Sequence, residues 1–187
     1  AMKKLHLIRH AKSSWSDRAL SDIDRPLNQR GLRSCALMAE QIVKAGCSFE
    51  HVFCSPALRA QSTIENIAQH LNQAAGGEGD NSLESGPPSS KSLRHRQIEW
   101  HTDPALYTFV MTDLLAWCQQ LDNSLPEVVI VGHNSAMTDF VNAIGNQPLG
   151  NLPTCGYVQL ALQIEDWRAL SPGAGDTISL LTPKMFK

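Results

Sequence analysis

Leu5-His6-Leu7-Ile8-Arg9-His10 decides the fold of this chain, because a short apolar run stops there at an Arg-His pair. The run predicts a buried strand that delivers a guanidinium and an imidazole to its carboxyl end. Ligands of open α/β sheets bind in the crevice beyond the carboxyl ends of the strands. A cationic side chain and an imidazole at that position indicate a site for an anion.

Two further strand ends carry side chains of the same kinds. Residues 53–63 pass from a short apolar strand through a turn into a helical pattern, with Arg59 in the first turn of the helix. Residues 127–132 form another buried strand pattern, and His133 follows it directly. As neighbours in one sheet, these strands would bring their side chains and two helix N-termini to the same crevice. The sequence therefore predicts one pocket built from Arg9, His10, Arg59 and His133.

Helical and strand patterns alternate along the middle of the chain. Apolar residues at helical spacing predict helices over residues 28–45 and 57–71. Residues 97–101 predict a short strand. Two later helices are expected, the first with Val110 at the start of its buried side and the second after His133.

The C-terminal part predicts the edge of the sheet. Residues 157–164 alternate as a half-buried strand does, and residues 166–168 with 177–181 predict a closing hairpin. We therefore expect a single α/β domain over residues 2–187, with three α/β/α layers and a central, mostly parallel sheet. Residues 73–96 are rich in Gly, Pro and Ser and poor in apolar residues, which predicts a flexible insertion.

Composition and charge argue against several classes of partner. A net charge of -2 speaks against a general binder of nucleic acid or anionic membranes. No apolar run reaches the length of a membrane span, and the N-terminal run lacks the pattern of a signal peptide. The five cysteines are scattered without a CxxC spacing, which predicts reduced thiols in a cytoplasmic protein.

Four motifs, in order along the chain, give the sequence a family resemblance. They are Arg9-His10-Ala11-Lys12-Ser13-Ser14-Trp15, Asp24-Arg25-Pro26-Leu27-Asn28-Gln29-Arg30-Gly31, Ser55-Pro56-Ala57-Leu58-Arg59-Ala60 and Val131-Gly132-His133-Asn134. As a set they resemble the histidine phosphatase superfamily, which includes phosphoglycerate mutases and acid phosphatases. The Arg-Pro-Leu-Asn segment, the Gly-His-Asn ending and residues 152–156 are most similar to the small SixA-type phosphohistidine phosphatases.

The resemblance implies a phosphoglycerate mutase-like fold and a set of catalytic roles. His10, as a neutral imidazole, would attack phosphorus and form a phosphohistidine intermediate that water hydrolyses. Arg9 and Arg59 would hold the phosphoryl oxygens, and a protonated His133 would stabilise the developing charge. No cofactor or metal is implied, and two arginines beside a histidine pair would repel a metal cation while favouring phosphate.

Further residues are expected around the substrate, each with an alternative role. Ser13 and Ser16 follow the Arg-His pair and are expected to donate to the phosphoryl group. Asn134 and Thr154 are expected to contact the substrate, although Asn134 can instead cap a helix and Thr154 can end a turn. Asp22, Asp24 and Arg25 are expected to pair with one another and fix the loop over the site, and the alternative for Arg25 is direct contact with the substrate.

An acidic proton donor to the leaving group is common in the superfamily. Glu99 and Asp103 are the candidates here. Neither lies in a distinctive motif, and Asp103 equally suits a cap on the turn before Pro104.

Three functions stay open at this point. The first is a metal-independent phosphatase for phosphohistidine on a protein, such as a phosphorelay or phosphocarrier domain. The second is a phosphatase for small phosphomonoesters. The third is a non-catalytic phosphoryl-binding module. An imidazole is a good leaving group, so weak acid catalysis is compatible with the first function.

Overall fold

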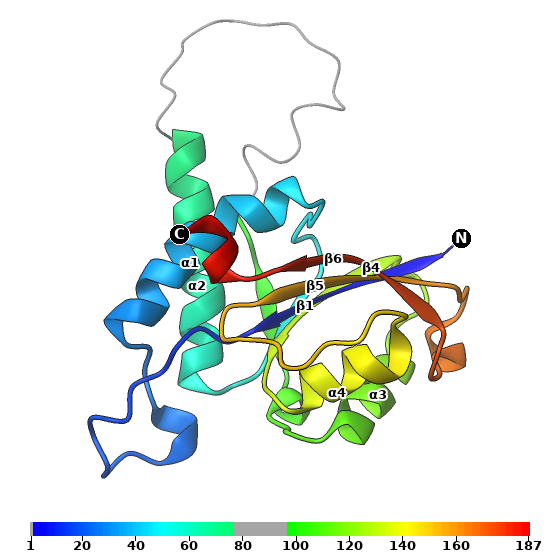
Figure 1. The fold of residues 1–187 in the computed structure, drawn as a ribbon, viewed down its shortest axis with the longest axis horizontal. Coiled ribbons are helices and arrows are strands. Elements are labelled where there is room, and N and C mark those ends of the chain that lie inside the picture. The colour runs from blue at the N-terminus through cyan, green and yellow to red at the C-terminus, as the bar shows by residue number, and fades with distance from the viewer. Residues whose placement is uncertain (1, 77–96) are drawn as a thin grey trace, which may run out of the picture.

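A six-stranded sheet forms the middle of the protein, in the computed structural model that describes residues 2–76 and 97–187 (Figure 1). The strand order is β3-β2-β4-β1-β5-β6. The first four of these strands are parallel, and β5 is antiparallel to both of its neighbours. The strands are β1 (Lys3–Arg9), β2 (Val52–Cys54), β3 (Trp100–Thr102), β4 (Glu127–Gly132), β5 (Tyr157–Leu162) and β6 (Gly175–Leu181).

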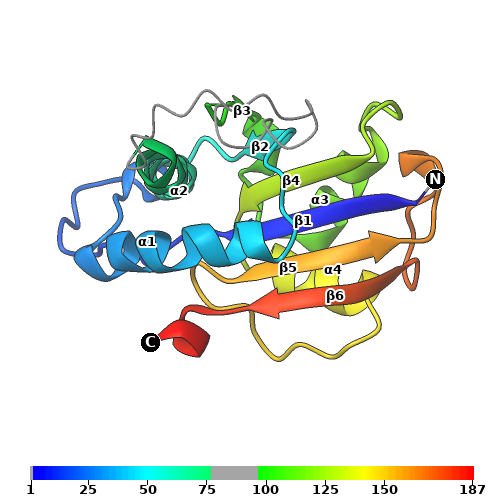
Figure 2. The same cartoon turned by 90° about the horizontal axis from the view of Figure 1, so that it is seen from above.

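Helices cover both faces of this sheet, as Figure 2 shows. One face carries α1 (Gln29–Lys44) and α2 (Leu58–Gly76), and the other carries α3 (Met111–Gln119) and α4 (Ala136–Ile144). Short 3-10 helices complete the chain: η1 (Asp22–Asp24), η3 (Pro104–Leu106), η4 (Trp167–Ala169) and η5 (Pro183–Phe186). The predicted α/β class, three layers and mostly parallel sheet are confirmed.

The central position of β1 explains its apolar sequence. Leu5 and Leu7 pack into the core under α3 and α4, whereas Ile8 packs into the core under α1 and α2. All three side chains are fully buried, because helices cover both sides of the strand. The strand leaves the core at its carboxyl end, which is Arg9.

Three predictions about single elements are wrong in detail. The strand β5 is buried on both faces rather than half-buried, because helices cover both faces and β6 takes the edge of the sheet. Trp167 lies in η4 and not in a strand, since the Asp166 carboxylate accepts from the Arg168 N–H and starts a helical turn. Val110 is 53% exposed at the N-cap of α3, although it was expected on the buried side.

The boundaries around the predicted insertion also shift. The helix α2 continues to Gly76, so the first residues of the predicted insertion at 73–96 are helical. Residues 77–96 lie outside the described residues. On the far side, the predicted strand at 97–101 is observed as β3, which begins at Trp100.

The five cysteines are all buried and unpaired in disulfides: Cys35, Cys47, Cys54, Cys118 and Cys155. Burial raises the pKa of the Cys47, Cys54 and Cys118 thiols well above the ordinary range. The observed cysteines therefore act as small apolar core residues. Of the helices in the described part of the chain, none is both long and apolar enough to cross a membrane.

Candidate active site

The carboxyl ends of β1, β2 and β4 meet at one edge of the sheet, because these strands are parallel and adjacent. Arg9 of β1 is in register with Gly132 of β4, and Cys54 of β2 is in register with Val131. The next residues in the chain then point into one space. The rings of His10 and His133 lie 5.3 Å apart between centroids, and Arg59 Nη2 lies 3.5 Å from His133 Nδ1.

His10 is held in a single orientation with one ring nitrogen free. Its Nδ1 lies 2.8 Å from the Ala11 carbonyl oxygen, which can only accept, so Nδ1 carries the proton and Nε2 keeps its lone pair. The backbone on both sides is fixed, since the His10 N–H donates to the Gly132 carbonyl and the Ala11 N–H donates to Thr63 Oγ1. Burial, and then the charges of nearby arginines, lower the pKa of His10 to about 4. At neutral pH the imidazole is uncharged and nucleophilic.

His133 is also neutral in this structure, whereas the resemblance implies a protonated His133 during phosphoryl transfer. Its Nδ1 faces the Nη2 donor of Arg59, so the proton is on Nε2, which donates to Ser55 Oγ over 2.8 Å. Burial, the neighbouring His10 and the charge of Arg59 lower the pKa of His133 to about 3. A bound phosphoryl group would add negative charge and act against this shift.

Arg9 and Arg59 hold positive charge beneath the two imidazoles. Arg9 donates from Nη1 to the Leu152 carbonyl over 2.8 Å. Arg59 is 2% exposed and donates to Asp22 from Nη1 and from Nη2. In both arginines the buried Nε lacks a hydrogen-bond partner within the described structure. Unsatisfied buried donors are costly, so these two arginines are held in place at a cost to the fold.

Asp22 is a site residue that the sequence did not reveal in this role. Its Oδ2 accepts from Arg59 Nη2 over 2.9 Å and from the Tyr107 hydroxyl, and its Oδ1 accepts from Arg25 Nε over 3.3 Å. Burial alone would raise the pKa of this carboxyl, but the hydrogen bonds from Tyr107 and Arg59 and the charges of Arg59 and Arg25 outweigh it and lower the pKa to about 2. The expected pairing of Asp22 with Arg25 is present, and it extends to Arg59 on α2.

Arg25 is a third cation of the site, and its side chain is buried. It donates from Nη1 to Ser13 Oγ over 2.7 Å, and its guanidinium lies 3.6 Å from the ring centre of Trp15. Its charge is one of the causes that lower the pKa of His10. The loop after β1 is thus fastened to the pocket through this arginine.

The remaining predicted contacts divide into those near the pocket and those away from it. Ser13 is buried next to Arg25, whereas Ser16 is exposed and bonds to Ser14. Asn134 caps α4, because its Oδ1 accepts from the Thr138 backbone N–H over 3.0 Å. Thr154 is partly exposed beside Cys155, whose N–H donates to the carbonyls of Arg9 and His10.

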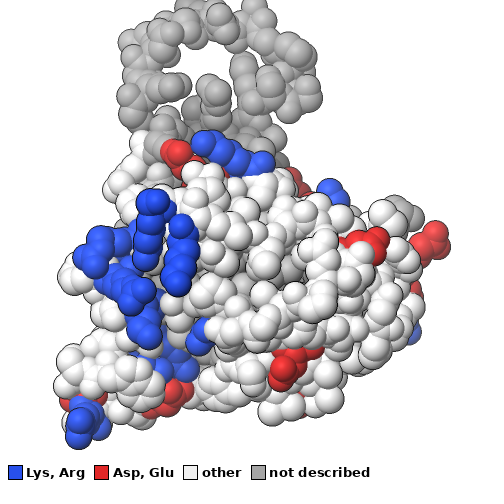
Figure 3. All heavy atoms as spheres, viewed as in Figure 1, with Lys and Arg blue, Asp and Glu red and all other residues white. Residues whose placement is uncertain are grey.

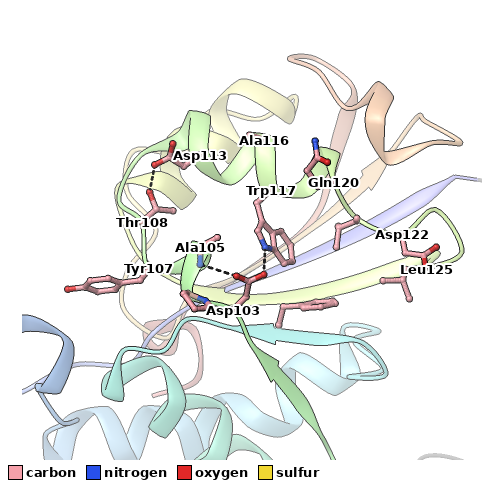
Figure 4. A pocket seen from close by; sticks show the side chains of 13 residues that line it. Asp103, Ala105, Tyr107, Thr108, Asp113, Ala116, Trp117, Gln120, Asp122 and Leu125 are labelled. Atoms are coloured by element: carbon pink, nitrogen blue, oxygen red, sulfur yellow. Dashed lines mark hydrogen bonds between the residues drawn. The ribbon is translucent and has the colours of Figure 1, made fainter.

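The two candidate proton donors do not contact the histidines. Asp103 accepts from the Ala105 N–H and from Trp117 Nε1, each over 2.9 Å, and so points into a cavity of about 810 Å³ beside α3 (Figure 4). Glu99 is exposed just before β3. These contacts favour the capping role for Asp103.

Two aromatic rings form a wall that the sequence did not indicate. Tyr107 and Phe109 lie against His133, with ring centroids 5.5 Å and 5.3 Å from the imidazole. In the sequence these two aromatic residues stand two positions apart, shortly after Asp103. That spacing is the signal that could have predicted them. Tyr107 is also one of the residues that line the Asp103 cavity (Figure 4).

Comparison with known proteins confirms the resemblance. Residues 5–78 match the profile of the Histidine phosphatase superfamily (branch 1). An uncharacterized chloroplastic protein of Arabidopsis thaliana is 35% identical over 70 residues, which are 37% of this chain and 32% of that protein. An uncharacterized protein of Picosynechococcus is 29% identical over 164 residues, or 84% of each chain.

Solved structures share the fold over almost the whole chain. A protein histidine phosphatase SixA complexed with tungstate has a TM-score of 0.69 at 20% identity, covering 98% of this chain and 99% of its own. A structure assigned to phosphohistidine phosphatase SixA from Nakamurella multipartitia has a TM-score of 0.71 at 16% identity, covering 98% and 97%. A mycobacterial glucosyl-3-phosphoglycerate phosphatase has a TM-score of 0.57 at 14% identity, covering 91% and 96%.

The fold is therefore that of the phosphoglycerate mutase-like histidine phosphatases. Within that class the chain resembles the SixA phosphohistidine phosphatases. Together, the profile match and these neighbours support a phosphatase.

Proposed function

We propose that this chain is a metal-independent phosphatase that uses His10 as its nucleophile and removes phosphate from phosphohistidine on a protein. The observation that carries the proposal is the state of His10. Its Nδ1 proton is bonded to Ala11, its Nε2 lone pair is free, and its low pKa keeps the ring neutral among arginines. A neutral imidazole surrounded by cations attacks an anionic phosphoryl group that the same cations bind.

The reaction proceeds in two displacements. In the first, His10 Nε2 forms a bond to phosphorus while the bond from phosphorus to the leaving group breaks, with Arg9 and Arg59 holding the equatorial oxygens. In the second, water attacks the phosphorus, the Nε2–P bond breaks, and inorganic phosphate leaves. The guanidinium charges stabilise both transition states.

The nature of the acids near the site favours a phosphohistidine substrate. Asp22 has a pKa of about 2 and accepts hydrogen bonds from Arg59, Arg25 and Tyr107, so it is ionised at neutral pH and has no proton to give. Asp103 is engaged by Trp117 and Ala105. An alkoxide leaving group needs a proton donor, whereas an imidazole needs far less help.

The surface around the pocket favours a macromolecular substrate. Four large apolar side chains adjoin the pocket residues and stay exposed: Trp15, Leu58, Phe109 and Val110. Trp15 packs on Arg25, Leu58 precedes Arg59, and Phe109 packs on His133. Exposed apolar side chains grouped around a site are typical of a protein interface. A small phosphomonoester would leave them uncovered.

The test measures phosphate release from a phosphohistidine-bearing phosphotransfer domain and from p-nitrophenyl phosphate, both in chelator. We expect release from both, a higher kcat/KM for the protein, and loss of at least about 10⁴-fold in His10→Ala. The matched control is His101→Ala, which removes an exposed histidine from β3 and should keep full activity. A preference for the aryl ester would favour the small-molecule function. Binding of phosphate without turnover would identify a phosphoryl-binding module.

A further inference from the structure

A group of cationic side chains lies beside the pocket without taking part in it. Its members are Lys12, Arg30, Arg33, Lys184 and Lys187, all of them exposed. Figure 3 shows lysine and arginine side chains gathered over the part of the molecule where Figure 1 draws the start of α1 and the C-terminus. We call these five residues the basic surface.

The fold brings the basic surface to the end of the sheet where β1, β2 and β4 terminate and the pocket lies. Lys12 is two residues after His10, and α1 packs on its backbone so closely that a methyl group on Gly31 would lie 2.3 Å from the Lys12 carbonyl oxygen. At the other end of the chain, Leu181 of β6 pairs with Tyr157, which pairs with Ile8 beside the pocket. The 3-10 helix η5 follows immediately and packs against α1.

The cations of the basic surface are not balanced by acids. None of the five forms an ion pair within residues 2–76 and 97–187. Along α1, no acidic residue stands three or four positions from Arg30 or Arg33. Both arginines also lie near the N-terminus of α1, where the helix dipole disfavours positive charge. The positive charge of these two arginines therefore does not stabilise the folded protein. This favours a role in binding a partner.

Three acids, Asp17, Asp22 and Asp24, lie in the loop over the pocket, where Asp22 is paired with Arg59 and Arg25, and other acids of the protein lie away from the basic surface. Five of them lie at the opposite edge of the sheet, before or at the start of β4 and β6 and after β5: Asp122, Glu127, Glu165, Asp166 and Asp176. Asp113 and Asp139 lie on the helices of the other face. The unpaired cations of the basic surface attract a negatively charged partner toward the side of the molecule that holds the pocket.

We propose that the basic surface docks an acidic face of the phosphorylated protein whose phosphohistidine enters the pocket. The inference rests on the proposed function and adds the chemistry of the partner. Charge pairing across this surface raises the rate of encounter, while the exposed apolar side chains around the pocket make the close contact. A small phosphate ester gains little from it, because it reaches the pocket without covering α1 or η5.

The experiment reverses two charges that are remote from the chemistry. In Arg30→Glu/Arg33→Glu we expect kcat/KM for an acidic phosphohistidine-bearing phosphotransfer domain to fall about tenfold or more at low ionic strength. The kcat/KM for p-nitrophenyl phosphate should stay within about twofold, because the pocket is intact. Added salt should lower the wild-type rate on the protein and narrow the difference between the two enzymes. Thermal unfolding should show an equal or higher Tm, since glutamate suits a helix N-terminus.

The matched control is Arg168→Glu, which reverses an exposed arginine after β5, at the opposite edge of the sheet. It should leave both rates unchanged. Equal losses on both substrates in the double variant, or no loss on the protein, would overturn the docking surface. Duplex DNA binding that is tighter than domain binding and is lost in the variant would overturn it too.

Docking is also measured without turnover, by titrating the phosphorylated domain into His10→Ala with and without the two reversals. Weaker binding in the reversed protein supports docking even if neither substrate is hydrolysed by the wild type. In that case the proposed function fails and the docking surface stands.

Discussion

His6 lies on β1 and His10 directly follows that strand, yet the two histidines end up in opposite electrostatic surroundings. His6 is fully buried, and its nitrogens lie 2.6 Å from the Tyr157 hydroxyl and 2.5 Å from Glu127 Oε1. His10 is almost as buried, but its charged neighbours are arginines. The hydrogen bonds among His6, Tyr157 and Glu127 are satisfied within the protein, with a donor for each acceptor. The His10 group has excess positive charge and unpaired donors, which a bound anion would complete.

Arg59→Met tests the incomplete side of this contrast most directly. Removing the guanidinium takes two potential donors and a charge from the pocket, so kcat/KM for p-nitrophenyl phosphate should fall about 10²–10³-fold. Steady-state kinetics measure the loss, and circular dichroism checks that the fold persists. Arg168→Met, an exposed counterpart, should lose nothing. A fall of less than tenfold in Arg59→Met would mean that this arginine serves Asp22 and the loop rather than the phosphoryl group.

His6→Ala tests the complete side. The substitution leaves a buried tyrosine hydroxyl and a carboxylate without their partner, so the free energy of unfolding should drop by roughly 2–4 kcal/mol. Chemical denaturation measures this drop. The kcat/KM of the folded variant should stay within about threefold. A large loss of activity at unchanged stability would show that the two groups are coupled along β1.

Acid pH should weaken the fold through His10 and His133. Their pKa values in the folded state, about 4 and about 3, lie below the ordinary value of 6.5. Between pH 6.5 and pH 4 the unfolded chain therefore binds more protons, so the free energy of unfolding falls as the pH falls through this window. Denaturation at a series of pH values measures the slope. His10→Gln/His133→Gln should flatten it, and an unchanged slope would assign the effect to other groups.

Asp103→Asn should have the smallest effect. Asparagine still caps the turn through its Oδ1 but cannot also accept from Trp117 Nε1, so the free energy of unfolding should fall by about 1 kcal/mol. Activity on p-nitrophenyl phosphate should stay within about threefold, because the carboxylate is bonded to Trp117 and to the Ala105 N–H. Rates for a series of aryl phosphates provide the sharper check. A loss that grows as the leaving group becomes poorer would restore Asp103 as a proton donor.

The sequence predicted the elements whose signals are local. An apolar run that ends in Arg9 and His10 fixes both the strand and the place of these side chains, and the same holds for His133. Arg59 was found because its turn and helix lie next to each other in the chain. The pocket followed from these strand ends once they were taken as neighbours in one sheet.

The features that were missed depend on distance in the chain or on burial. Asp22 reaches Arg59 across 37 positions and Tyr107 across 85, which no local pattern encodes. The lowered pKa of His133 depends on how deeply the folded chain encloses the ring, which no local pattern reports. The sequence of β5 predicts a half-buried strand because its alternation shows only which side chains are polar. The burial of β5 in the folded protein depends on β6, which pairs with it.

The enclosed thiols have a practical consequence for spectroscopy. Because all five cysteines are buried, and burial raises the pKa of the Cys47, Cys54 and Cys118 thiols, alkylating reagents reach few thiols and find little thiolate on the folded protein. A single cysteine placed at Trp15, which is 70% exposed beside Arg25, would then be modified selectively in the native background. A spin label or fluorophore at that position would follow the loop over the pocket during turnover.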